Sequence, residues 1–175
     1  MSRESGMDIE RLEYIKNVNA NIDWAYHGYS VGAYFKLNFK AGEEEGKGKG
    51  VDNHVLSLPV KSLIILSQKP KDKPKRYLTH VVELVNEGSE DKSQWEGGTW
   101  GTFRWAKVHW VANLVNLDRI PIDEEVMKVN WGWFDTKAKL LSSPGLMSEW
   151  GNIETLRVHL KETFIPAAQE AYALR

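Results

Sequence analysis

The stretch KSLIILSQKPKDKPKRYLTHVVELV, residues 61–85, decides the fold that the sequence predicts. Two apolar segments, 61–68 and 77–85, predict β-strands, and the second is rich in β-branched residues. Between them lies a basic turn with two prolines, residues 69–76. Two strands joined by a short polar link predict an antiparallel hairpin. The hairpin therefore indicates a protein built around a β-sheet.

Two more strands are predicted, one on each side of the hairpin in sequence. In residues 31–39, Val, Ala, Phe and Leu side chains alternate with Gly, Tyr, Lys and Asn, which is the period of a half-buried strand. Residues 103–115 predict the longest strand, with an apolar even face from Ala106 to Leu114 and a mixed odd face. We expect the even face to contact a core and the odd face to be half solvated.

Helices are predicted outside this sheet. Asp8 is placed to cap a short helix in which Ile9, Leu12 and Ile15 recur at helical spacing. Besides a last short helix that starts at Pro166, three further helices are expected, and Ser142–Gly145 is expected to form a turn. They are a short helix capped by Asp123 and running through Val129, a helical piece over 135–141, and an amphipathic helix capped by Asn152 with Ile153, Leu156, Leu160 and Phe164 on one face.

These elements predict an α+β protein with a curved, mostly antiparallel β-sheet and peripheral helices. The 175 residues suit a single domain, 1–175, with a flexible loop rich in Gly, Glu and Lys at 40–53. The formal net charge of -1 argues against a histone-like binder, and the lack of cysteine excludes a disulfide scaffold. The longest aliphatic run, Leu63–Leu66, is far short of the ~20 residues that span a bilayer. We expect a cytoplasmic protein.

Motifs of catalysis are missing from the sequence. The glycine run 46–50 does not meet the phosphate-loop pattern, and the five histidines lack metal-binding spacing. No nucleophile elbow is present. We therefore expect neither an enzyme nor a cofactor or metal. An alternative is an enzyme acting on a nucleotide or a small flat metabolite, with His80 or His109 as acid or base. A protein-interaction subunit is a third hypothesis.

Tryptophan and basic residues carry more information. Eight tryptophans are unusually many for 175 residues, and Trp95 and Trp100 flank a Gly-Gly pair in a polar loop. The turn 69–76 is strongly basic, and Arg104 and Lys107 follow the loop. Basic side chains interleaved with aromatic ones are typical of nucleic-acid binding through phosphates and base stacking. The alternative is that the tryptophans pack in the core and the turn only aids solubility.

Four stretches carry a family resemblance: PVKSLIILS (59–67), YLTHVVELV (77–85), WGTFRWAKVHWV (100–111), and IPI (120–122) together with LLSSPGL (140–146). They resemble the PUA-like superfamily and, within it, the EVE and YTH branch. The resemblance implies a small PUA-like barrel flanked by helices, with a pocket for one flipped base. In the YTH branch, aromatic rings cage a methylated base.

The resemblance also implies roles for particular residues. Trp95 or Trp100 would match the loop tryptophan of the cage, Trp24 would supply another wall, and Ser67 would match a polar pocket residue. Asn53 and Asp52 would match the polar group on the incoming loop. The expected partner is single-stranded or distorted nucleic acid, RNA or DNA, with a modified base. The expected phosphate contacts are Lys69, Lys71, Lys73, Lys75, Arg76 and Arg104.

Overall fold

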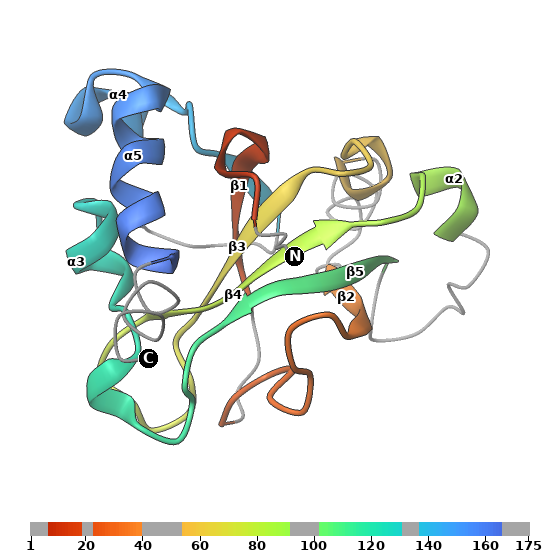
Figure 1. Cartoon of the computed structure of the whole chain (residues 1–175), viewed down its shortest axis with the longest axis horizontal. Helices are drawn as coiled ribbons and strands as arrows, with labels where there is room; N and C mark the ends of the chain where they lie inside the picture. Colours follow the sequence, from red (N-terminus) through yellow and green to blue (C-terminus); the bar gives the residue numbers. More distant parts are fainter. Residues whose placement is uncertain (1–6, 19–22, 40–53, 92–101, 131–136, 166–175) are drawn as a thin grey trace, which may run out of the picture.

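Six strands form one mixed sheet in the order β2-β5-β4-β3-β1-β6 (Figure 1). The computed structural model describes residues 7–18, 23–39, 54–91, 102–130 and 137–165. The sheet curls into a half-barrel, so the α+β class and the curved sheet are as predicted. The strands are β1 (Leu12–Asn17), β2 (Tyr34–Phe39), β3 (Leu63–Gln68), β4 (Tyr77–Leu84), β5 (Thr102–Val111) and β6 (Ala138–Leu140).

The predicted hairpin is confirmed and lies in the middle of the sheet. Strands β3 and β4 pair antiparallel, with Ile64 opposite Val82. Every residue of β3 is buried, which explains its continuous apolar run. Strand β4 also pairs antiparallel with β5, and β5 with β2. The predicted alternation is confirmed in β2, where Phe35, Leu37 and Phe39 are the buried residues.

The predicted N-terminal helix is wrong beyond its first turn. A 3-10 helix, η1 (Ile9–Arg11), begins after Asp8, whose side chain accepts the Glu10 N–H at 3.1 Å. The chain then enters β1, which pairs parallel with β3 and antiparallel with β6. Five of the six β1 residues are buried, because neighbours cover both edges and both faces of the strand. Such burial removes the two-residue period, and the helical spacing of apolar residues was coincidental.

In the described residues after β5, the chain is mostly helical and contains one strand, β6, that was not predicted. Residues 138–140, predicted as helix, form β6. The predicted turn at 142–145 is confirmed at Ser142, whereas a helix begins at Pro144. The amphipathic helix is confirmed, since Asn152 Oδ1 accepts the Thr155 N–H at 2.8 Å. The helices are α2 (Gly88–Asp91), α3 (Asp123–Met127), α4 (Pro144–Trp150) and α5 (Ile153–Phe164), with a 3-10 turn η3 (Leu117–Arg119).

Two apolar clusters lie on opposite faces of the sheet. Helices α3, α4 and α5 cover one face (Figure 1), where Leu156, Leu160 and Phe164 pack on residues of β1, β3 and β4. On the other face, segments 23–26 and 55–58 pack on side chains of β2 and β5 such as Leu37 and Val108. Within the described residues, no helix is long and apolar enough to cross a membrane.

A bulge in β5 changes the predicted even face. Val82 pairs with Val108 and Val81 pairs with Trp110, so His109 is an extra residue in β5. Ala106 and Val108 therefore belong to one cluster, whereas Trp110 belongs to the other. The Trp110 ring lies 4.7 Å from the Phe164 ring of α5. The even residues of this strand thus divide between the two faces.

Candidate functional site

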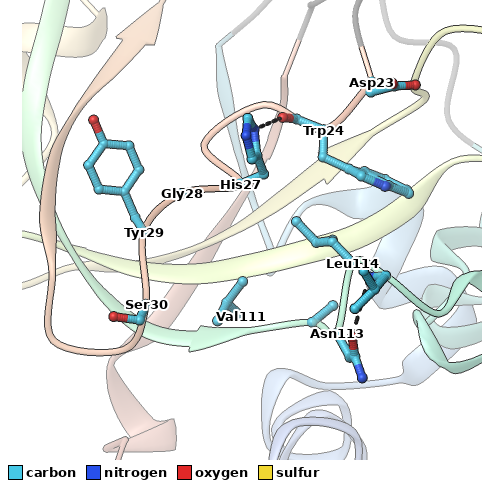
Figure 2. A pocket seen from close by; sticks show the side chains of 11 residues that line it. Asp23, Trp24, His27, Gly28, Tyr29, Ser30, Val111, Asn113 and Leu114 are labelled. Atoms are coloured by element: carbon cyan, nitrogen blue, oxygen red, sulfur yellow. Dashed lines mark hydrogen bonds between the residues drawn. The ribbon is translucent and has the colours of Figure 1, made fainter.

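An open pocket of 730 Å³ lies between segment 23–30 and residues 111–115, which start at the last residue of β5 and continue past it (Figure 2). Its size is within the range of sites for small molecules and cofactors. We call it the Trp24 pocket. It is lined by Asp23, Trp24, His27, Gly28, Tyr29, Ser30, Val111, Ala112, Asn113, Leu114 and Val115.

Segment 23–30, which forms one wall of this pocket, is held to the sheet by hydrogen bonds to residues of β3 and β2. Gln68 Nε2 donates to the Asp23 carbonyl at 2.8 Å, and Gln68 Oε1 accepts the Ala25 N–H at 3.0 Å. Tyr26 adopts a left-handed backbone with φ 58°, and its hydroxyl accepts the Asn38 N–H at 3.0 Å. The unusual φ at Tyr26 turns the chain so that His27 to Ser30 face the pocket.

Trp24, which the resemblance made a cage wall, lines the Trp24 pocket. Its indole is half-buried and meets the Tyr77 ring edge-on, with centroids 5.7 Å apart. Together with Leu114 and Ile122, it packs against a small apolar cluster. The buried residues of this cluster are Tyr77, Ala112 and Ile120. At the other end of the pocket lies Tyr29, which is 40% exposed (Figure 2). Two aromatic side chains are therefore available to a flat ligand.

Polar groups at the pocket come from both walls. His27 Nδ1 lies 2.9 Å from the Trp24 carbonyl oxygen. Because a carbonyl only accepts, Nδ1 carries the proton, and Nε2 of the neutral ring is an acceptor. Across the pocket, Asn113 Oδ1 accepts the Val115 N–H at 3.3 Å (Figure 2). Asp23 adds a carboxylate and Ser30 a hydroxyl. A ligand with donors and acceptors on its edge would find partners here.

The basic turn 69–76 is tied to the pocket at both of its ends. Gln68, which precedes it, bonds the backbone of Asp23 and Ala25, and Tyr77, which follows it, contacts the Trp24 ring. Lys69, Lys71 and Lys75 are exposed, and Lys73 is half-buried. The turn therefore begins and ends beside residues that contact segment 23–25 of the pocket wall.

Arg76 differs from the lysines of this turn. Its Nη1 donates to Asn17 Oδ1 at 2.6 Å and to the Ser67 carbonyl at 3.2 Å. Burial lowers the pKa of Arg76, and the nearby Asp123 carboxylate acts in the opposite direction. Arg76 thus joins the turn to β1 and β3 as well as adding positive charge.

Two predicted site residues are buried and do not line the Trp24 pocket. Ser67 is fully buried, and its hydroxyl donates to the Asp123 carboxylate. Arg104 is also fully buried, and its Nη1 donates to the Val55 and Leu58 carbonyls, each at 2.8 Å. Neither side chain has exposed surface for a base or a phosphate. In this structure their roles are internal: Ser67 holds the start of α3, and Arg104 holds segment 55–58 on the sheet.

Four predicted pocket residues, Asp52, Asn53, Trp95 and Trp100, lie outside the described residues. The loop predicted at 40–53 also lies outside them. The aromatic cage built on Trp95 or Trp100 therefore stays a prediction.

A second pocket, of 380 Å³, shares Tyr29 with the first. We call it the Tyr34 pocket. It is lined by Tyr26, Tyr29, Tyr34, Phe35, Lys36, Asn38 and Trp105. The sequence analysis missed Tyr29 and Tyr34. Tyr34 had a sequence signal, because it is an aromatic residue at an outward position of the alternating segment 31–39.

The histidines of the enzyme hypothesis lie outside both pockets. His80 is fully buried, with Nδ1 2.8 Å from Thr79 Oγ1, and burial lowers its pKa to about 4. His109 Nε2 pairs with Glu83 Oε1 at 2.7 Å on a different part of the sheet. Among the described residues, no group of three or more His, Asp or Glu side chains is arranged to hold a metal ion. These placements give the acid–base hypothesis no support from either pocket.

No protein-family model, no curated protein sequence and no solved structure matches this chain.

Proposed function

We propose that the chain is a nucleic-acid-binding module that holds one base of a single-stranded or distorted strand in the Trp24 pocket. The observation that carries the proposal is the attachment of a basic turn to an aromatic pocket through Gln68 and Tyr77. The PUA-like barrel and the reading of a modified base are parts of the same proposal. The curled sheet is compatible with a PUA-like barrel, and the aromatic side chains of the pocket suit the binding of a modified base.

Stacking supplies the main attraction in this proposal. Trp24 and Tyr29 present aromatic surface to the pocket. One base stacked on an aromatic ring contributes about 1–3 kcal/mol, whichever base it is. Extruding a base costs a few kcal/mol, and the cost is least for an unpaired or damaged base. The ligand is therefore single-stranded or locally distorted.

Hydrogen bonds then fix the orientation of the base. His27 Nε2 offers an acceptor, and Asp23 offers a carboxylate. These acceptors suit the exocyclic amino groups and ring N–H groups on the edge of a base. Ser30 adds a hydroxyl that can donate or accept.

Phosphate attraction comes from the basic turn. Residues 69–76 hold five basic side chains and one acidic one, although the whole chain has a net charge of -1. The positive field is local, so it attracts the strand next to the pocket without bulk attraction elsewhere. Binding should weaken with salt, because phosphate contacts release counterions.

The test is a titration of labelled oligothymidylate and oligouridylate at low salt, followed by fluorescence anisotropy. Tyr29→Ala should weaken binding about tenfold, because one stacking interaction contributes about 1–3 kcal/mol. Leu140→Ala is the control, since Leu140 is 48% exposed on the opposite edge strand β6 and lies in neither pocket. The two oligonucleotides distinguish DNA from RNA as the preferred ligand. Equal affinity of both variants, or no binding of either oligonucleotide, would refute the proposal.

A charge-reversal pair tests the basic turn. Lys71→Glu should weaken binding and lower the slope of log K against log salt by about 0.7, the value for one phosphate of a single strand. Lys161→Glu is the matched control, because Lys161 is also exposed but belongs to α5. If both variants weaken binding equally, the attraction is general and the turn has no special role.

A further inference from the structure

The Tyr34 pocket is joined to the Trp24 pocket through one side chain. Tyr29 lines both of them. Its ring stacks on Phe35 of β2, with centroids 5.1 Å apart and planes at 25°. Phe35 in turn contacts the Tyr26 ring at 4.2 Å. The Tyr29 ring thus packs against Phe35, and this partly exposed side chain lies between the two pockets.

The Tyr34 pocket has the composition of a nucleotide site. Tyr34 is 53% exposed on the edge strand β2, and Trp105 lies on the neighbouring strand β5. Lys36 is the register partner of Trp105, and its Nζ lies 5.7 Å from that ring and 4.8 Å from the Phe103 ring. The pocket therefore combines aromatic surface with an exposed ammonium group.

The chemistry of single strands explains why these two pockets occur side by side. Proteins that bind single strands stack successive bases on successive aromatic rings along a positively charged path. Here the order along the surface is the Trp24 pocket, Tyr29, and the Tyr34 pocket with Lys36. The smaller volume, 380 Å³, lies within the usual range for small-ligand sites.

We propose that the Tyr34 pocket holds the nucleotide adjacent to the base in the Trp24 pocket. This inference rests on the proposed function and adds the substrate class: a single strand of at least two nucleotides. Tyr34 stacks on the second base, and Lys36 contacts a phosphate beside it. Tyr29 lies between the two bases and contributes to both subsites.

The experiment compares thymidine 5′-monophosphate with thymidylate di- and tetranucleotides by titration, using tryptophan fluorescence and NMR. The wild-type chain should bind the dinucleotide about tenfold more tightly than the mononucleotide, because a second stacking interaction is made. Tyr34→Ala should remove most of this gain and leave mononucleotide affinity within about twofold, whereas Tyr29→Ala should weaken both ligands. Lys36→Gln should lower the salt slope for the dinucleotide by about 0.7.

The outcomes separate the two proposals. If the mononucleotide binds but the dinucleotide binds no more tightly, the second subsite is refuted and the proposed function stands. The same holds if Tyr34→Ala weakens both ligands equally. If no ligand in the series binds, both proposals fail. Leu140→Ala should match the wild type for every ligand, and thermal unfolding followed by circular dichroism should show that Tyr34→Ala is folded.

Discussion

Replacing Arg104 by methionine should destabilise the fold strongly. The guanidinium is fully buried and donates to three backbone carbonyls, those of Val55, Leu58 and Asn86. These carbonyls belong to segment 55–58 and to Asn86, which lie 46–49 and 18 residues before Arg104 in the sequence. Methionine keeps most of the apolar stem of arginine but removes all three donors. The carbonyls then lose these donors, although the Val55 carbonyl still accepts the Leu58 N–H at 3.3 Å.

The magnitude follows from the number of bonds lost. A hydrogen bond to a charged group contributes about 1.5–3 kcal/mol, and an unsatisfied buried acceptor costs about 1–3 kcal/mol. The three losses share one side chain and are not additive, so we take the low end for each and expect about 4 kcal/mol in total. For a chain of this size, that corresponds to a fall in melting temperature of about 8–16 °C.

Urea unfolding followed by circular dichroism measures this change. Arg119→Met is the matched control, since Arg119 is exposed in η3, and its effect should stay within about 0.5 kcal/mol. Arg104→Lys should also destabilise, because one ammonium cannot replace a planar group that serves three carbonyls. A loss of less than about 1 kcal/mol for Arg104→Met would refute the reasoning.

Two further predictions concern stability. Burial lowers the pKa of His80 from 6.5 to about 4, so the unfolded chain binds the proton more tightly and stability should fall as pH drops from 6.5 towards 4. The free energy of unfolding should fall by an amount on the order of 3 kcal/mol over this range, as measured by urea unfolding. The His80→Gln variant should not show this pH dependence. Gly88→Ala should destabilise by about 1–3 kcal/mol, because a Cβ there would strike the Leu56 backbone. Gly145→Ala should be nearly neutral in the same assay, since nothing lies within 4 Å of its Cβ position.

The strands that were predicted from sequence are those with a simple period or a simple apolar run. In β2 the exposed residues Tyr34 and Lys36 alternate with buried Phe35 and Leu37, as expected for a strand with one covered face. The central hairpin was predictable because its strands are buried on both faces and its turn is strongly polar. Local sequence and tertiary environment agree in these elements.

Strands β1 and β6 were missed because their evidence is not local. Strand β1 pairs parallel with β3, about fifty residues later, and that pairing leaves no hairpin signal in the sequence. Strand β6 has only three residues and pairs with β1. A strand that short is defined by its partner's backbone, and its sequence carries too few residues for any period.

The candidate site was predicted in part. Trp24 lines the Trp24 pocket, and the basic turn 69–76 follows Gln68, which bonds the pocket wall, whereas Ser67 and Arg104 are internal. The burial of Arg104 had a sequence signal: it shares the even positions of Ala106 and Val108, which the alternation placed on the core face. A charged side chain that is fully buried at such a position needs hydrogen-bond partners inside the protein, and here they are backbone carbonyls. Tyr29 carried no comparable signal, because segment 23–33 has no regular period.

The bulge at His109 connects the pocket to the helical core. It places Trp110 on the α5 side, where its ring meets Phe164. Trp110 also packs on the small cluster of Tyr77, Ala112 and Ile120, and Trp24 packs on the same cluster. Without the extra residue, the side chains that follow it would point to the opposite faces, since strand side chains alternate. The orientation of residues 111–115, which line the pocket, therefore depends on the bulge in β5. The packing of Trp24 on its small cluster depends on the same bulge, because Trp110 contacts both this cluster and the core beneath α5.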